Sequence, residues 1–247
     1  MKVIVVIPAR YGSSRFEGKV LAKDTGKYLV QHTYERALCA KNVARVLVAT
    51  DCDAVMRACA GFGAECVMTS AAHESGTDRI AEAVSDIEAD VIVNLQADEP
   101  EIDPRNIETV ASLLWEQPEA NMATLVARFD RHEEIADPNV VKVVVDERGR
   151  AIYFSRSVIP YDRQAAGAGD TSHYLRHMGI YAFRKAFLAT FTQLEPGVLE
   201  RIEKLEQLRA IERGYSIVTG KVACTWEGID TPQQYQAFVK RYLAGQR

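Results

Sequence analysis

The stretch KVIVVIPARYGSSRFEGK, residues 2–19, decides the fold. Its first part, KVIVVIP (2–8), is a continuous apolar run, as expected of a parallel strand buried on both faces. Its second part carries three cationic side chains and two glycines: Arg10, Gly12, Arg15, Gly18 and Lys19. Because ligands gather at the carboxyl ends of strands in an α/β sheet, this loop predicts an anion site at the end of the first strand.

The loop matches neither common phosphate-binding motif. Five residues separate Gly12 from Gly18, where a P-loop has four, and Val20 stands where that motif needs Ser or Thr. It is not G-x-G-x-x-G either. Arginine can bind phosphate in a bidentate manner, lysine acts as a point charge, and glycine lets the backbone approach an anion. The alternative is a solvated basic loop.

Strands and helices alternate through the first half of the chain. We expect further strands over 43–50, 64–69 and 90–96. We expect helices over 28–40, 53–63, 77–87 and 104–117. Thr77 is a plausible cap of the third helix. This repeat predicts an α/β fold with a doubly wound, mostly parallel sheet.

The pattern changes in the second half. Strands are expected over 122–129, 140–156 and 174–183, with ERGR (147–150) as a hairpin turn. Helices are expected over 184–194, 199–214 and 231–245. The last begins with Thr231-Pro232 and has Gln234 in capping-box position. In the helix over 199–214, the predicted buried stripe is Leu199, Ile202, Leu205 and Leu208.

Composition excludes several classes of protein. The 247 residues are 47% hydrophobic and 26% charged, with a net charge of -4, which argues against nucleic-acid binding through bulk charge. No apolar run approaches the ~20 residues that span a bilayer, and Arg10 closes the first run too early for a signal peptide. We expect a cytoplasmic protein. Its five cysteines are odd in number and lack C-x-x-C spacing, which predicts free, mostly buried thiols.

Carboxylates mark two further positions. Asp98 and Glu99 follow the fourth expected strand in NLQADEPEID (94–103), and Asp230 precedes a helix in EGIDTPQQ (227–234). Two aspartates that hold Mg²⁺ beside phosphates are a recurrent arrangement in phosphoryl and nucleotidyl transfer. The alternatives are a turn acid for Asp98 and a helix cap for Asp230.

Polar groups elsewhere are more ambiguous. Ser75, Gly76 and Thr77 in HESGTDR (73–79) could offer polar groups to a base or phosphate, or could only cap a helix. His177 in its strand could be structural. Glu206 and Gln207 could belong to a solvated helix face.

Seven stretches, in this order, resemble the 3-deoxy-manno-octulosonate cytidylyltransferase (CMP-Kdo synthetase) family: IPARYGSSRFEGK, HESGTDR, LQADEP, YFSRSVIPY, RHMGIYAF, LEQLR and IDTP. The resemblance runs nearly end to end. It implies transfer of CMP from CTP to Kdo with release of pyrophosphate, for lipopolysaccharide synthesis, by a homodimer. It also implies one domain over 1–247, with a nucleotide-binding core of about 1–130 and 215–247. Residues 131–214 would serve sugar binding and dimer contacts.

The resemblance also implies roles for single residues. CTP would be bound by Ala9, Arg10, Gly12, Arg15, Lys19, Ser75, Gly76, Thr77, Arg79, Gln96 and Asp98. Mg²⁺ would be held by Asp98 and Asp230. The residues expected to carry catalysis are Arg10, Arg15, Lys19, Asp98 and Asp230. The sugar acid would be contacted by Arg156, His177, Tyr181, Glu206 and Gln207, with the arginine facing its carboxylate.

Five positions depart from the family pattern, mostly on the nucleotide side. Proline is replaced by Glu17, Val20 and Tyr28, glycine by Ala97, and an apolar residue by Glu101. Glu17 could point to solvent, pair with a neighbouring cation, or repel phosphate. A positive φ at Ala97 would cost about 1–2 kcal/mol. The alternatives to Kdo are therefore a related acid such as 8-amino-Kdo, or a nucleotide-binding relative with impaired turnover.

Overall fold

A computed structural model of the chain describes residues 1–12, 15–223 and 228–245. Four residues named in the sequence motifs or thiol prediction lie outside the described residues: Ser13, Ser14, Cys224 and Glu227. Within the described part, no helix combines the length and apolar character needed to cross a bilayer.

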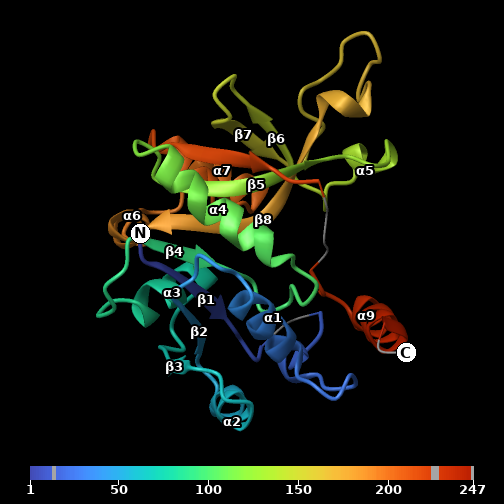
Figure 1. Cartoon of the computed structure of the whole chain (residues 1–247). Helices are drawn as coiled ribbons and strands as arrows, with labels where there is room; N and C mark the ends of the chain where they lie inside the picture. The colour runs from blue at the N-terminus through green and yellow to red at the C-terminus, as the bar shows by residue number, and fades with distance from the viewer. Residues whose placement is uncertain (13–14, 224–227, 246–247) are drawn as a thin grey trace. The chain divides into compact units, whose positions relative to one another are not determined.

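The chain forms two compact units. The first comprises residues 1–108 and 226–247, and the second comprises residues 109–225. These boundaries differ from those of the functional parts expected from the sequence, since residues 109–130 and 215–225 belong to the second unit. Each unit has its own strands and helices (Figure 1).

Four parallel strands form the core of the first unit: β1 (Val3–Pro8), β2 (Arg45–Thr50), β3 (Cys66–Met68) and β4 (Val91–Asn94). Their order is β3-β2-β1-β4. Val5 pairs with Val46 on one side and with Val93 on the other. Because the chain order reverses between β1 and β4, the carboxyl ends of these two strands form the switch point at which α/β sheets bind ligands.

The helices of the first unit are α1 (Leu29–Leu38), α2 (Asp53–Gly61), α3 (Gly76–Ala83) and α9 (Pro232–Gly245), with a short 3-10 helix at Lys19–Leu21. A buried cluster joins α1 to the C-terminal segment through Leu29, Ile229 and Phe238. This packing places the last helix beside α1 in the first unit, although some 200 residues separate the two helices in sequence.

In the second unit, β5 (Met122–Arg128) lies antiparallel to β8 (Leu175–Arg184) and parallel to β9 (Ile217–Lys221). β6 (Lys142–Val145) and β7 (Ala151–Ser155) form a hairpin. The predicted turn lies between them, and Gly149 adopts φ 76° there. The helices are α5 (Glu133–Ala136), α6 (Lys185–Phe191), α7 (Val198–Glu203) and α8 (Leu208–Glu212), and α4 (Pro104–Glu116) leads into the unit.

The α/β class and the mostly parallel sheet are confirmed, but three local predictions are wrong. The helix expected over 199–214 is broken at Lys204, which has φ 55°, so α7 and α8 are separate. Ile202 is consequently 74% exposed rather than part of a buried stripe. Thr77 is buried within α3, and Ser75 is the cap, accepting a hydrogen bond from the N–H of Asp78 at 3.0 Å.

Two further predictions need correction. No strand is expected from the sequence at β9, where the apolar run is interrupted at Thr219 and Gly220. The thiols are less buried than expected: among the described cysteines only Cys59 is buried, and Cys39 is exposed.

Candidate active site

The loop after β1 is shaped by a tight approach of two residues. Gly18 has φ 67°, and a Cβ on it would lie 3.1 Å from the ring of Tyr11. The N–H of Gly18 donates to the carbonyl of Tyr11 at 2.9 Å. Glycine is therefore required here, both for its conformation and for its size. The turn leads into the 3-10 helix, whose Val20 is buried and anchors Lys19.

A cavity of about 410 Å³ lies at the carboxyl edge of the sheet of the first unit, lined by Pro8, Arg10, Gly12, Arg15, Lys19, Val20, Gly76, Gln96, Ala97, Asp98 and Asp230. It draws on four segments: the loop after β1, the start of α3, the end of β4 and the residues before α9. Eight of the predicted nucleotide or metal residues thus line one space. The carboxylates bring negative charge to a wall that is otherwise cationic.

Lys19 joins the two aspartates predicted to hold metal. Its Nζ lies 2.5 Å from Oδ2 of Asp98 and 3.1 Å from Oδ1 of Asp230, and it donates to the carbonyl of Ile229 at 2.9 Å. The guanidinium of Arg15 lies 3.0 Å from Oδ1 of Asp230. One ammonium thus offsets the repulsion between two carboxylates. The lysine side chain is only 12% exposed, so this attraction is weakly screened.

Local sequence explains where Asp230 lies. Thr231 and Gln234 form the predicted capping box: the N–H of Gln234 donates to the hydroxyl of Thr231, and Oε1 of Gln234 accepts from the N–H of Thr231 at 3.0 Å. The same oxygen accepts from the N–H of Asp230 at 2.9 Å. The capping box confirms the predicted helix start and leaves the carboxylate of Asp230 free to face Lys19.

Long-range bonds fix Asp98. Its carbonyl accepts from the N–H of Ile229 at 2.8 Å, which ties the loop after β4 to the residues before α9. The hydroxyl of Thr33, on α1, donates to the carbonyl of Ala97 at 3.0 Å. Two carboxylates from distant parts of the chain are thereby held on one side of the cavity.

The donor set fits a hard divalent cation that shares its shell with a ligand. No group of three or more His, Cys, Asp and Glu side chains that could hold a metal occurs among the described residues. Asp98 and Asp230, which meet at Lys19, are the pair of carboxylates that could hold Mg²⁺, an ion that commonly completes its shell with water and phosphate oxygens.

Four predicted nucleotide residues do not line this cavity. Ala9 and Thr77 are buried, and Ser75 caps α3. Arg79 is fully buried, and its guanidinium donates to Asp51 at 2.7 Å and to the hydroxyl of Thr69 at 2.6 Å. Arg79 therefore joins α3 to the residues that follow β2 and β3 and does not face the cavity.

The departures from the family pattern have local explanations. Glu17 is exposed, and no ion pair joins it to any described residue, so it points to solvent. Ala97 does not have a positive φ, so the backbone strain considered for this position is not present. Tyr28 packs under the ammonium of Lys23 at 4.5 Å. Glu101 forms a two-bond ion pair with Arg241 on α9.

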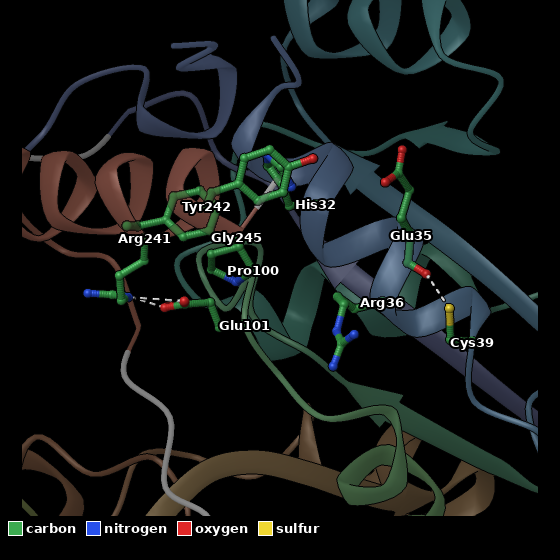
Figure 2. Close-up of a pocket in the computed structure, with 10 residues that line it drawn as sticks. His32, Glu35, Arg36, Cys39, Pro100, Glu101, Arg241, Tyr242 and Gly245 are labelled. Atoms are coloured by element: carbon green, nitrogen blue, oxygen red, sulfur yellow. Dashed lines mark hydrogen bonds and ion pairs between the residues drawn. The ribbon is translucent and has the colours of Figure 1, made fainter. Parts of the chain in front are cut away.

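The Glu101–Arg241 pair borders a second cavity of the first unit, of about 520 Å³, where α1 and α9 face the loop after β4 (Figure 2). Its walls include His32, Arg36 and Tyr242. Its wall holds cations and anions together, and none of the predicted site residues lines it. The candidate active site of this unit is therefore the cation-rich cavity at the sheet edge.

In the second unit, Arg156 is held by backbone carbonyls. Its Nε donates to the carbonyl of Glu203 at 2.8 Å, and its NH1 donates to the carbonyl of Pro138 at 2.9 Å. Fully buried Lys142 donates to the carbonyls of Asp137, Val140 and Arg156 at 2.6–2.9 Å. Sequence analysis does not single out Lys142, and a lysine inside the apolar run VVKVVV (140–145) is the signal that could have done so.

His177 and Tyr181 lie together on β8. Their ring centroids are 5.3 Å apart, and Phe154 meets the His177 ring edge-on at 5.0 Å. Burial lowers the pKa of His177 to about 3, so its imidazole is neutral at physiological pH. A neutral ring among aromatic neighbours is suited to a neutral polar group of a ligand.

Glu206 and Gln207 lie in the turn between α7 and α8, not on a solvated helix face. Gln207 is 4% exposed, and its buried Nε2 has no hydrogen-bond partner among the described residues. Because a buried donor without a partner is costly, this amide favours a ligand contact over the solvated alternative.

A parallel sheet with cations and paired carboxylates at its switch point defines a nucleotide-binding α/β protein of the nucleotidyltransferase class. The sequence model of the cytidylyltransferase family matches residues 4–217. The chain is 45% identical to a solved CMP:2-keto-3-deoxy-manno-octonic acid synthetase complexed with CTP; the match covers all of both chains with a TM-score of 0.93.

Curated relatives with similar sequences are also named as cytidylyltransferases. A 3-deoxy-manno-octulosonate cytidylyltransferase from Escherichia coli is 48% identical over 98% of each chain. One from Syntrophus aciditrophicus is 47% identical over 99% of this chain and 98% of its own. An 8-amino-3,8-dideoxy-manno-octulosonate cytidylyltransferase from Shewanella piezotolerans is 47% identical over 94% and 95%. The chain belongs to the 3-deoxy-manno-octulosonate cytidylyltransferase (CMP-Kdo synthetase) family of nucleotidyltransferases.

Proposed function

We propose that the protein transfers CMP from CTP to the anomeric hydroxyl of Kdo, with Mg²⁺, and supplies CMP-Kdo for lipopolysaccharide synthesis. The hydroxyl oxygen forms a bond to the α-phosphorus, the bond to the β-phosphate oxygen breaks, and pyrophosphate leaves. The observation that carries this proposal is the single ammonium of Lys19 shared by Asp98 and Asp230 in a cavity with Arg10 and Arg15.

The cationic residues of this cavity bind the triphosphate. Arg10 and Arg15 offer planar guanidinium groups that fit phosphate oxygens, and Lys19 offers a point charge. Lys19 and Arg15 pair with carboxylates in the ligand-free protein. When the triphosphate binds, its phosphate oxygens replace these carboxylates as partners of the two cations. Their charge offsets the negative charge that develops on the departing pyrophosphate.

Asp98 and Asp230 would hold the metal ion. Bound Mg²⁺ would supply charge stabilisation to the phosphate oxygens. The two carboxylates come from segments joined by the Ile229–Asp98 backbone bond, so their separation is set by the fold rather than by the ligand. No protein nucleophile is required, since positioning and electrostatics supply the acceleration.

The second unit supplies the sugar-acid residues. Arg156 faces the carboxylate of the acid, because a guanidinium fixed by two backbone carbonyls keeps its remaining donors in a set direction. His177 and Tyr181 contact hydroxyl groups, and Glu206 and Gln207 complete the set. The partnerless Nε2 of Gln207 supports this assignment.

The test is pyrophosphate release by the purified protein from CTP, MgCl₂ and Kdo, with a panel of the four ribonucleoside triphosphates. We expect release that requires CTP, Kdo and the metal together, and its loss on chelation with EDTA. Binding of CTP without release with any sugar acid would instead indicate a nucleotide-binding relative with impaired turnover.

A second acceptor has a specific observation in its favour. The relative named for the 8-amino acid is as similar to this chain as several named for Kdo. The panel therefore includes 8-amino-Kdo, and release with that acid but not with Kdo would reassign the acceptor. The homodimer implied by the resemblance remains a prediction, which light scattering after size-exclusion chromatography would test.

A further inference from the structure

The ladder between β5 and β8 contains a bulge next to His177. Thr124 pairs with Tyr181, but the next residue, Leu125, pairs with Met178, so β8 has two extra residues at this point. Bulges of this kind redirect side chains and are frequent beside functional sites. Thr124 lies opposite the bulge and is completely buried.

The hydroxyl of Thr124 meets three polar atoms of the bulged strand. Its Oγ1 lies 2.7 Å from the carbonyl oxygen of Ile180, 3.2 Å from that of Met178 and 2.9 Å from Nε2 of His177. A hydroxyl has one proton to donate, and a carbonyl oxygen can only accept. The proton therefore points to the carbonyl side, with Ile180 the nearer acceptor.

The orientation of this hydroxyl determines the tautomer of His177. Because the hydroxyl of Thr124 donates its proton to a carbonyl oxygen, its Oγ1 presents a lone pair to Nε2 of His177. Nε2 must therefore carry a hydrogen and donate it to Oγ1. The opposite tautomer would leave both carbonyl oxygens facing an oxygen without a shared proton. Nδ1 then holds a lone pair, and it has no hydrogen-bond partner among the described residues.

We propose that Thr124 is a positioning residue that fixes His177 as the Nε2-protonated tautomer, so that Nδ1 accepts a hydrogen bond from a hydroxyl group of the sugar acid. The rings of Phe154 and Tyr181 hold the imidazole plane in place. An acceptor at this position selects a neutral or cationic donor and rejects a carboxylate, which leaves the acid group to Arg156. The inference rests on the proposed function only for the sugar contact.

The tautomer can be measured without any substrate. Long-range ¹H–¹⁵N correlation spectra of histidine-labelled, ligand-free protein at pH 7 distinguish a protonated from an unprotonated ring nitrogen. His177→Gln assigns the signal by its loss. We expect Nε2 protonated in the wild type and in Thr124→Ser, and a mixed or reversed tautomer in Thr124→Val.

Kinetics test the consequence for binding. Thr124→Val should raise KM for the sugar acid about 5- to 10-fold, as expected for loss of one well-oriented hydrogen bond, with KM for CTP unchanged. Thr124→Ser, which keeps the hydroxyl, should restore the wild-type KM. A merely structural role would change both KM values together or neither.

Two results would overturn the inference. One is a wild-type spectrum with the hydrogen on Nδ1, which needs only the wild-type protein and so does not depend on the folding of any variant. The other is an altered tautomer in Thr124→Val with an unchanged KM for the sugar acid. Absence of turnover with every acid would count against the proposed function alone, since the spectra require no substrate.

Discussion

Around Lys19, charged side chains of the first unit satisfy one another, whereas around Arg156 and His177 the polar groups of the second unit are bonded mainly to the backbone. Lys19 and Arg15 pair with Asp98 and Asp230, and Arg15 is 63% exposed. Such ion pairs can exchange partners when another anion arrives, because each charge remains hydrogen-bonded throughout.

The polar groups of the second unit are held by the backbone. Lys142 donates to three carbonyls, Arg156 donates to two, and Thr124 lies opposite the bulge of β8, where it donates to a carbonyl. Backbone carbonyls cannot leave without unfolding the segment that carries them. The difference teaches that the cavity around Lys19 is organised by exchangeable charge and the surroundings of Arg156 and His177 by fixed geometry. Substitutions in the first unit can therefore change ligand binding without a large loss of stability more readily than substitutions in the second unit.

The largest effect is expected from loss of either aspartate. Asp98→Ala or Asp230→Ala should lower turnover by at least about 10³-fold, equivalent to about 4 kcal/mol, because each removes one of the two carboxylates proposed to hold Mg²⁺. Lys19 keeps its bond to the remaining carboxylate, so the thermal midpoint should stay close to that of the wild type. Pyrophosphate release and calorimetry measure the two quantities.

The matched control for these variants is Glu17→Ala, which removes an exposed carboxylate from the loop after β1 and should leave turnover near the wild-type value. Near-normal rates in either aspartate variant would remove that residue from metal binding.

The next largest effect should come from Lys142. Lys142→Met leaves three carbonyls without their buried donor and should lower the free energy of unfolding by about 3 kcal/mol. It should also raise KM for the sugar acid, because Arg156 loses support for its backbone, with KM for CTP unchanged. Urea unfolding and steady-state kinetics measure these effects.

Lys221→Met, which replaces the exposed last residue of the otherwise mostly buried β9, is the control and should be close to neutral. Equal stability of the two methionine variants would show that the buried ammonium has no organising role.

A smaller effect concerns pH and His177. Its pKa is lowered from 6.5 to about 3, so between these values the unfolded chain binds a proton that the folded chain does not. Stability attributable to this group is present above about pH 6.5 and is lost as pH falls towards 3, by at most about 1.4 kcal/mol per pH unit. Urea unfolding at pH 7 and pH 5 should show a larger decrease for the wild type than for His177→Gln. Equal decreases in the free energy of unfolding for the two proteins would contradict the lowered pKa of His177.

The smallest effect is expected from Glu17→Pro. The N–H of Lys19 donates to the carbonyl of Phe16 at 3.3 Å, so Glu17 and Gly18 are the central residues of a turn, with Gly18 at φ 67°. Proline followed by glycine suits such a turn. Reduced freedom of the free loop, worth about 0.4–1 kcal/mol, should tighten CTP binding about 2- to 5-fold. Calorimetric titration measures this, and weaker binding would mean that Glu17 is useful as it stands.

Much of the first unit could be predicted from sequence because its signals are local. Buried parallel strands read as apolar runs, and the Thr231–Gln234 capping box is visible within four residues. The family pattern then supplied residues that the structure does bring to one cavity. It also supplied Arg79, whose burial against Asp51 depends on packing between α3 and the ends of β2 and β3.

By itself, the sequence determined the α/β order, the cationic loop after the first strand and the carboxylates at the ends of later segments, since periodicity and turn chemistry act over a few residues. Only the tertiary structure decided that Lys19 would join Asp98 to Asp230, that α7 would end at Lys204 and that Thr124 would meet His177. These contacts depend on strand register and helix packing between residues far apart in the chain, and no local pattern encodes a register or a distance of that kind.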